Sequence, residues 1–160
     1  MPQAESGSRV GVLDIQAVFE RSRVGKRALA RLMEELGETR RLLTIEEGRL
    51  KELSDQLERE RDVVSPERTR ARTEDYLSRL ERYRWQVQVF NLDLARRHRA
   101  LVAEYLPRIE AVAAPLAEQQ GLVAILHQGR SETVMIVYYH APELDLTNLV
   151  IDALDRDLEQ

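Results

Sequence analysis

The sequence contains no cysteine, so structural disulfides and thiolate metal sites are excluded. Aromatic residues make up only 5% of the chain, which leaves few of the bulky side chains that fill a globular core. No apolar run is long enough to cross a bilayer as a helix. The polar first residues, MPQAESGS, are unlike a signal peptide, so we expect an exported protein to be represented here by its mature form.

What the chain has instead is charge, since 32% of its residues are Asp, Glu, Lys or Arg. The formal net charge is −4, which argues against nucleic-acid binding through overall charge. A hydrophobic content of 43% is too high for a disordered chain. This combination favours long, solvated helices that each bury one apolar stripe.

The sequence offers no motif for catalysis. The stretch VGKR is a fragment of a phosphate-binding loop, but that motif requires Gly and Ser or Thr where this chain has Glu20 and Arg27. The histidines are His98, His127 and His140, and their spacing does not indicate a metal cluster. We expect His98 to be a hydrogen-bonded core histidine. We therefore predict no enzyme activity, no cofactor and no metal site.

Apolar residues predict two long helices. Leucine recurs every seven residues from Leu29 to Leu57, which predicts a helix from Leu29 to about Asp62 with a coiled-coil seam. A second helix follows, in which mostly apolar residues recur in steps of three and four from Tyr76 to Tyr105, and the seam extends to Leu116. The predicted seam residues are Leu29, Leu36, Leu43, Leu50, Leu57, Leu80, Val87, Leu94 and Leu101. Polar residues interrupt the second column of the first seam at Thr39, Glu46 and Glu60.

The stretch VVSPE separates the two helices. Ser65 is a favourable N-cap, and Pro66 is preferred at the first helical position while excluding helix at the residue before it. A continuous rod leaves both stripes in water, whereas an antiparallel hairpin buries each against the other. The sequence therefore predicts a hairpin in which residues whose numbers total about 130 lie level.

The two ends of the chain predict a small β-containing part. Arg9–Ile15, Leu122–His127 and Thr133–Tyr139 are rich in β-branched and apolar residues, and the last two are expected to form a β-hairpin. Asp14 and Asp145 are candidate helix caps, and a short break is expected at Arg21–Arg27. The fold class is α+β. The predicted parts are a β-body with a C-terminal helix at 9–28 and 107–158, a hairpin at 29–106 with its tip near 62–66, and disorder at 1–8.

The β-part predicts association. Val134 to Tyr139 is apolar on both faces, and a body with so few strands leaves open edges and poorly buried apolar surface. Copies that join their strands into one closed barrel solve both problems. The alternative is a small α/β sandwich that its own C-terminal helix covers.

Two stretches resemble the terminal motifs of the Skp (OmpH-like) periplasmic chaperones: VGVLDIQAVFERSRVGKRALARL near the start and LDLTNLVIDAL near the end. The resemblance covers Arg9 to Leu158 and implies a homotrimer whose β-body closes into a barrel and whose hairpins surround a cavity. It also implies an ATP-independent holdase for unfolded outer-membrane proteins in the periplasm. The acidic charge argues against membrane or lipopolysaccharide contact. The resemblance assigns the trimer body to Val10, Val12, Leu122, Ala124, Val134, Ile136 and Tyr138.

Some apolar residues of the hairpin lie off the seam, where an isolated hairpin does not need them. We predict that these residues hold clients by non-directional contact: Leu42, Ile45, Trp85, Val89 and Leu92. They equally suit packing between hairpins or stiffening of a bend, and a structural coiled-coil spacer without clients is the alternative function. Gly37 and Gly48 either make this stretch pliable or are ordinary tolerated glycines.

Overall fold

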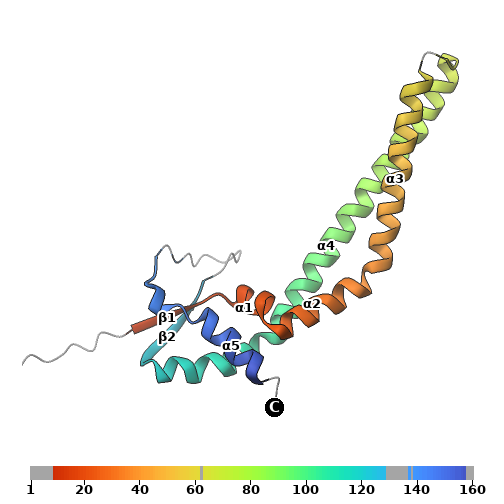
Figure 1. Cartoon of the computed structure of the whole chain (residues 1–160). Helices are drawn as coiled ribbons and strands as arrows, with labels where there is room; N and C mark the ends of the chain where they lie inside the picture. Colours follow the sequence, from red (N-terminus) through yellow and green to blue (C-terminus); the bar gives the residue numbers. More distant parts are fainter. Residues whose placement is uncertain (1–8, 62, 129–136, 138, 158–160) are drawn as a thin grey trace, which may run out of the picture. The chain divides into compact units, whose positions relative to one another are not determined.

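The computed structural model describes residues 9–61, 63–128, 137 and 139–157. The predicted disorder of residues 1–8, and nearly all of the strand predicted at Thr133–Tyr139, lie outside these ranges. The elements, drawn in Figure 1, are β1 (Arg9–Leu13), α1 (Ile15–Arg21), α2 (Arg23–Glu35), α3 (Gly37–Glu60), α4 (Pro66–Gln119), β2 (Leu122–His127), a 3₁₀ turn (Pro142–Leu144) and α5 (Thr147–Asp157). The long helical hairpin is confirmed, and the sheet among the described residues has two strands.

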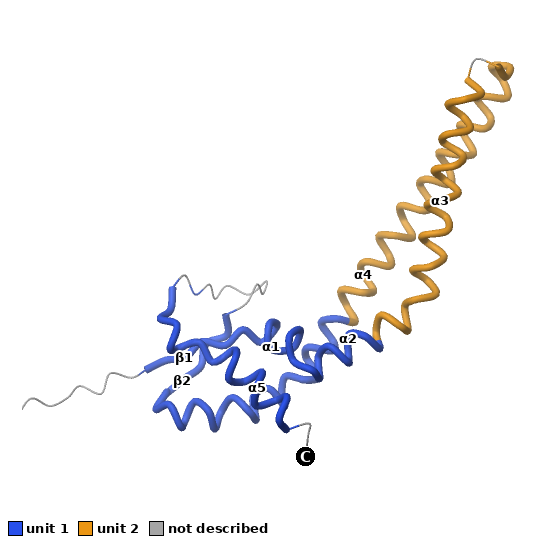
Figure 2. The backbone as a smooth tube through the Cα atoms, viewed as in Figure 1, with its two compact units in different colours: residues 1–31, 98–160 blue, residues 32–97 orange. Residues whose placement is uncertain are grey.

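The chain forms two compact units, shown in Figure 2. Residues 1–31 and 98–160 make up the first, which we call the body unit, and residues 32–97 make up the second, the hairpin unit. The sequence placed these boundaries after residues 28 and 106. In the structure the body unit also includes the ends of the two long helical segments that adjoin it, because Leu29, Leu101 and Tyr105 pack against its core.

The sheet of the body unit is parallel. β1 pairs with β2, with Val10 opposite Ala124 and Val12 opposite Leu126. Parallel neighbours require a long crossover connection, and here the helices α1 to α4 supply it. The β-hairpin predicted between β2 and Thr133–Tyr139 involves residues outside the described ranges. Among the described residues, the neighbour of β2 is β1.

Local hydrogen bonds fix the helices around this sheet. The Asp14 carboxylate accepts from the Ala17 N–H at 2.9 Å and caps α1, as its position after a strand predicted. The Asp145 carboxylate accepts from the Thr147 N–H at 2.9 Å where α5 begins. The Thr147 hydroxyl in turn accepts from the Asp14 N–H at 3.1 Å. The starts of α1 and α5 are thus tied together although they are far apart in sequence.

The core of the body unit is formed mainly by α1, the end of α4 and α5, and Leu13 of β1, Ala28 of α2 and Leu122 of β2 complete it. Val18, Leu146 and Val150 are fully buried, and Phe19 and Ile109 nearly so. The Phe19 ring lies 5.4 Å from that of Tyr105 and 6.1 Å, edge to face, from that of His98. His98 is half-buried, and its Nε2 lies 3.5 Å from the Glu20 carboxylate.

The break between the first helices lies at Ser22, and Gly25 belongs to α2. The Ser22 hydroxyl contacts both the Phe19 carbonyl, at 3.1 Å, and the Gly25 N–H, at 3.2 Å. A Cβ on Gly25 would lie 1.6 Å from the Phe19 carbonyl oxygen. Gly25 therefore allows close backbone approach rather than causing the break by its own flexibility.

The single helix predicted from Leu29 to Asp62 is wrong, because α2 ends at Glu35 and α3 begins at Gly37. Leu36 between them has ψ −3°, far from the usual helical value, just before a residue of low helix propensity. The Leu36 N–H donates to the Leu32 carbonyl, and the Leu36 carbonyl accepts from the Arg40 N–H. Because these two hydrogen bonds bridge the interruption, the irregularity is local.

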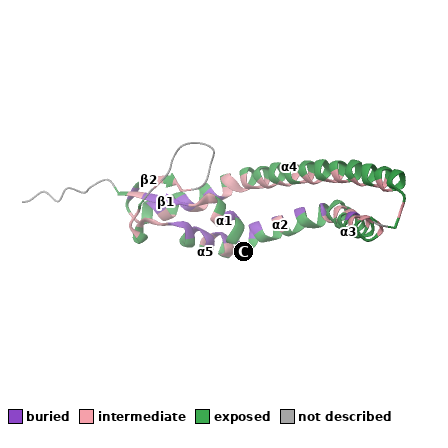
Figure 3. Cartoon of the chain, turned by 90° about the horizontal axis from the view of Figure 1, so that it is seen from above, coloured by how far each residue is buried: buried purple, intermediate pink, exposed green. Residues whose placement is uncertain are grey.

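The second long helix follows its prediction. α4 begins at Pro66 and continues through Pro107 and Pro115 to Gln119. Gly121 follows it with φ +66°, a left-handed conformation that favours glycine and ends the helix. Figure 3 shows exposed residues along most of α4.

Candidate functional site: an exposed groove on the helical hairpin

Polar contacts fix the alignment of α3 and α4 in the hairpin unit. Arg97 pairs with Glu35 at 3.4 Å near one end, and Arg72 pairs with Glu60 near the tip. Arg72 also contacts Gln56 at 3.4 Å. In each of these two ion pairs, the two residue numbers add to the same total. This is expected where two helices run antiparallel in constant register.

The predicted seam residues lie on the side of each helix that is withdrawn from solvent. Leu36 and Leu50 are buried. Half-buried are Leu43, Leu57, Leu80, Val87 and Leu94 in the hairpin unit, and Leu29 and Leu101 in the body unit. The seam therefore uses one stripe per helix, and other apolar residues of α3 and α4 are left over.

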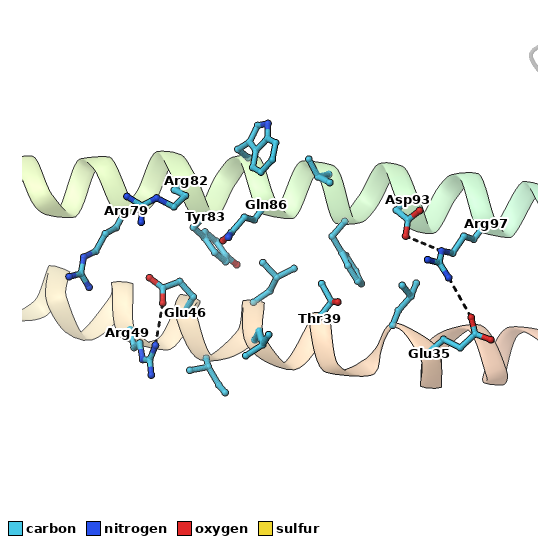
Figure 4. A pocket seen from close by; sticks show the side chains of 17 residues that line it. Glu35, Thr39, Glu46, Arg49, Arg79, Arg82, Tyr83, Gln86, Asp93 and Arg97 are labelled. Carbon is cyan, nitrogen blue, oxygen red and sulfur yellow. Dashed lines mark hydrogen bonds and ion pairs between the residues drawn. The ribbon is translucent and has the colours of Figure 1, made fainter.

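A groove of about 840 Å³ opens along α3 and α4 within the hairpin unit (Figure 4). Thr39 and Glu46, two of the three polar interruptions of the first seam, both line it. At these two positions no apolar side chain fills the space against the facing helix, so the groove stays unfilled. From α4, the side chains of Tyr83 and Gln86 extend towards α3.

The five predicted client-binding residues are all exposed. The exposed fractions are 55% for Leu42, 40% for Ile45, 64% for Trp85, 43% for Val89 and 63% for Leu92. All of them except Leu92 line the groove. We call these five residues the apolar face. The structure thus brings four of them together from two helices and leaves Leu92 outside the groove.

Charged residues surround the apolar lining in arginine–carboxylate pairs. Arg97 lies 2.9 Å from Asp93 and 3.4 Å from Glu35. Arg49 lies 3.6 Å from Glu46. Each carboxylate that lines the groove therefore has an arginine partner on one of the two helices.

Two further groove residues, Arg82 and Gln86, were missed by sequence analysis, which followed apolar periodicity only. Both are exposed residues of α4 that line the groove. Arg82 lies three residues from Trp85, and Gln86 lies three residues from both Tyr83 and Val89, and this spacing was the available signal. Burial and then the Glu47 carboxylate raise the pKa of Tyr83, so its phenol stays a neutral hydrogen-bond donor at pH 7.

A second, smaller groove lies in the body unit. It measures about 500 Å³ and is lined by residues of β2 and of the end of α4, including Ile109, Ala113 and Ala117. On β2, Val123 is 66% exposed and Leu126 is 36% exposed. The strand therefore presents apolar side chains to solvent beside an apolar groove.

The predicted trimer-body residues fall into two groups. Val12 and Leu122 are buried, Val10 is half-buried and Ala124 is exposed. Val134, Ile136 and Tyr138 lie outside the described ranges. The described residues of this set therefore contribute partly to the core of one chain and partly to the exposed side of β2.

In the described ranges, no group of three histidine or acidic side chains is placed to hold a metal ion. Nδ1 of His127 instead lies 3.1 Å from the Leu13 carbonyl oxygen. None of the helices that the structure describes has the length and apolarity needed to span a bilayer.

Comparison with known proteins places this fold. The profile of the outer membrane protein (OmpH-like) family matches residues 9–154. A crystal structure described as an OmpH-like outer membrane chaperone from Caulobacter crescentus CB15 is similar in fold, with a TM-score of 0.55, 15% identity, and coverage of 98% of this chain and 89% of that chain. No curated protein matches the sequence. Because the profile spans nearly the whole chain, the protein belongs to the OmpH-like family.

Proposed function

We propose that this protein is an ATP-independent holdase that binds unfolded outer-membrane proteins in the periplasm. In this proposal it acts as a homotrimer whose β-bodies join into a barrel and whose hairpins surround the client. Family membership and the chaperone description of the Caulobacter crescentus neighbour support the class of function. The acidic net charge of −4 argues against membrane or lipopolysaccharide contact as part of it.

The apolar face is the observation that carries the proposal. Large apolar side chains of this kind are 40% to 64% exposed along two helices that already have a seam. Contiguous exposed apolar surface marks an interaction site, and apolar contact has no strict sequence requirement. A holdase needs such contact because its clients differ in sequence. In a structural spacer these residues would instead pack one hairpin against another or stiffen a bend.

The exposed side of β2 supports association of several copies. Val123 and Leu126 are apolar and solvent-exposed, and the body groove beside them is lined by small alanines of α4 that allow close approach. Sedimentation equilibrium at micromolar concentration tests this part of the proposal. We expect about three times the monomer mass of 18.5 kDa, and a monomeric protein would contradict the trimer.

The holdase function is tested by refolding a β-barrel membrane protein from urea and following light scattering. We expect the wild-type protein to suppress aggregation in the absence of ATP. We expect a variant carrying Leu42→Ser, Ile45→Ser, Trp85→Ala and Val89→Ser to lose most of this suppression. These side chains are exposed, so the thermal unfolding temperature should change little.

Leu77→Ser is the matched control, because Leu77 is 51% exposed on α4 but does not line the groove. It should retain the suppression of aggregation. Undiminished suppression by the groove variant with unchanged unfolding would contradict client binding at the apolar face. Absence of suppression by the wild-type protein would favour the spacer instead.

A further inference from the structure

We propose that the hairpin groove prefers polypeptide segments in which a carboxylate lies next to large apolar residues, and that Arg82 receives this carboxylate. The inference rests on the proposed function, because it specifies which segments of a client enter the same groove. It adds a directional contact to a surface whose other contacts are apolar.

The charges that line the groove carry the inference. The lining carboxylates of Glu35, Glu46 and Asp93 are all paired with arginines that line the groove. The lining residue Arg79 is paired with Asp75 at 3.0 Å. Among the described residues, Arg82 is therefore the lining arginine without an ion-pair partner. When Asp75 is counted with the lining residues, four arginines face four carboxylates, so Arg82 is distinguished by its lack of a partner and not by an excess of positive charge.

Arg82 is placed beside the apolar face. It precedes Trp85 by three residues and Val89 by seven, and side chains at these spacings share one face of a helix. Ile45 and Leu42 of α3 line the same groove. Figure 4 shows Arg82 on α4 near Arg79 and Tyr83. The groove thus combines an apolar centre with an unpaired guanidinium at one end.

A guanidinium recognises a carboxylate by two parallel hydrogen bonds, which adds direction as well as charge. A segment with leucine or phenylalanine beside glutamate satisfies both parts of the groove at once. A segment with lysine in the same position meets a like charge. Because Arg82 is exposed, we expect only about a threefold gain in affinity from its ion pair at low salt.

The pattern of charges around the groove argues for a peptide rather than an anionic lipid surface. Protein sites that bind anionic membranes use clusters of several basic residues without interleaved carboxylates. The arginines around this groove are interleaved with Glu35, Glu46 and Asp93, which would repel a lipid surface. A single unpaired arginine instead suits a single carboxylate.

Peptide binding tests the inference directly. Trp85 is the single tryptophan of the chain and lies in the groove, so its fluorescence reports occupancy. Two short peptides are titrated that share the same leucine and phenylalanine residues and differ in one flanking residue, glutamate in one and glutamine in the other. Anisotropy of a label on each peptide provides a second measure of affinity. We expect about threefold tighter binding of the glutamate peptide at low salt, and equal affinities at high salt.

Arg82→Gln should remove the preference for glutamate while leaving the glutamine peptide unaffected. Arg84→Gln is the matched control, because Arg84 is an exposed arginine of the same helix that does not line the groove. It should keep the preference. Equal binding of both peptides to the wild-type protein overturns the inference alone and leaves the holdase function standing.

Binding of neither peptide, together with unsuppressed aggregation in the refolding assay, overturns the proposed function as well. Phosphatidylglycerol vesicles are the remaining probe. If they change Trp85 fluorescence in an Arg82-dependent way while the glutamate peptide does not, the groove binds anionic lipid and the inference is wrong.

Discussion

In the body unit, Val18, Leu146 and Val150 have no exposed surface, whereas in the hairpin unit Leu42, Trp85 and Leu92 keep more than half of theirs. The body unit therefore buries its apolar residues in a core to which both helices and strands contribute. The hairpin unit has only one neighbour for each helix, so a single stripe satisfies its packing and further apolar residues stay available. The same residue types thus form the core of one unit and stay exposed in the other, where we propose that they bind clients.

The largest effect is expected from the body core. Phe19 is 1% exposed and contacts the rings of His98 and Tyr105. The Phe19→Ala substitution therefore leaves a cavity that the surrounding helices cannot fill. We expect a loss of about 3 to 5 kcal/mol in the free energy of unfolding. Urea unfolding followed by circular dichroism measures it. All variants are compared at one protein concentration, because association contributes to stability.

A smaller effect separates the seam from the apolar face within the hairpin unit. Leu50 is 5% exposed and Leu42 is 55% exposed, although both are leucines of α3. We expect Leu50→Ala to cost about 2 kcal/mol and Leu42→Ala less than about 0.5 kcal/mol in urea unfolding. Equal losses for both leucines would mean that Leu42 is packed in the native assembly, and the apolar face would then not be available to clients.

The smallest expected effect concerns Tyr83 at the groove. Its folded-state pKa is raised above 10.0 by burial and then by Glu47, so the folded protein holds this proton more tightly than the unfolded chain does. The resulting contribution to stability is complete below pH 10 and is lost as pH rises through the folded-state pKa. Stability measured from pH 9 to pH 11 should therefore fall less steeply in Tyr83→Phe than in the wild-type protein. Tyr76→Phe is the control tyrosine, and an unchanged slope in Tyr83→Phe would contradict the assignment.

Local signals in the sequence were sufficient for much of the hairpin. Pro66 sets the start of α4 because its ring excludes helix at the preceding residue, and Asp14 caps α1 through its own side chain. These effects act within a few residues, so sequence periodicity and cap chemistry predict them. The heptad pattern likewise identifies the buried stripe, because helix geometry alone decides which residues share a face.

Features that depend on distant residues were not predicted. The pairing of β1 with β2 is set by the packing of α1, α4 and α5, and no local pattern specifies it. The short break expected at Arg21–Arg27 is present at Ser22, but the interruption at Leu36 was not predicted, because the heptad pattern runs through it. The groove charges were also missed, because which arginine lacks a partner is settled only once two helices face each other.

The parallel pairing of β1 and β2 has a consequence for how the length of the helical hairpin can change. The whole helical hairpin is inserted between two strands that are neighbours, so the strands do not depend on how many residues lie between them. Removing one heptad from α3 and one from α4, at matched distances from the tip, restores the same seam in a shorter arm. Arm length is therefore adjustable in steps of about 10 Å without a change in the sheet, which gives evolution or design a simple way to lengthen or shorten the hairpin.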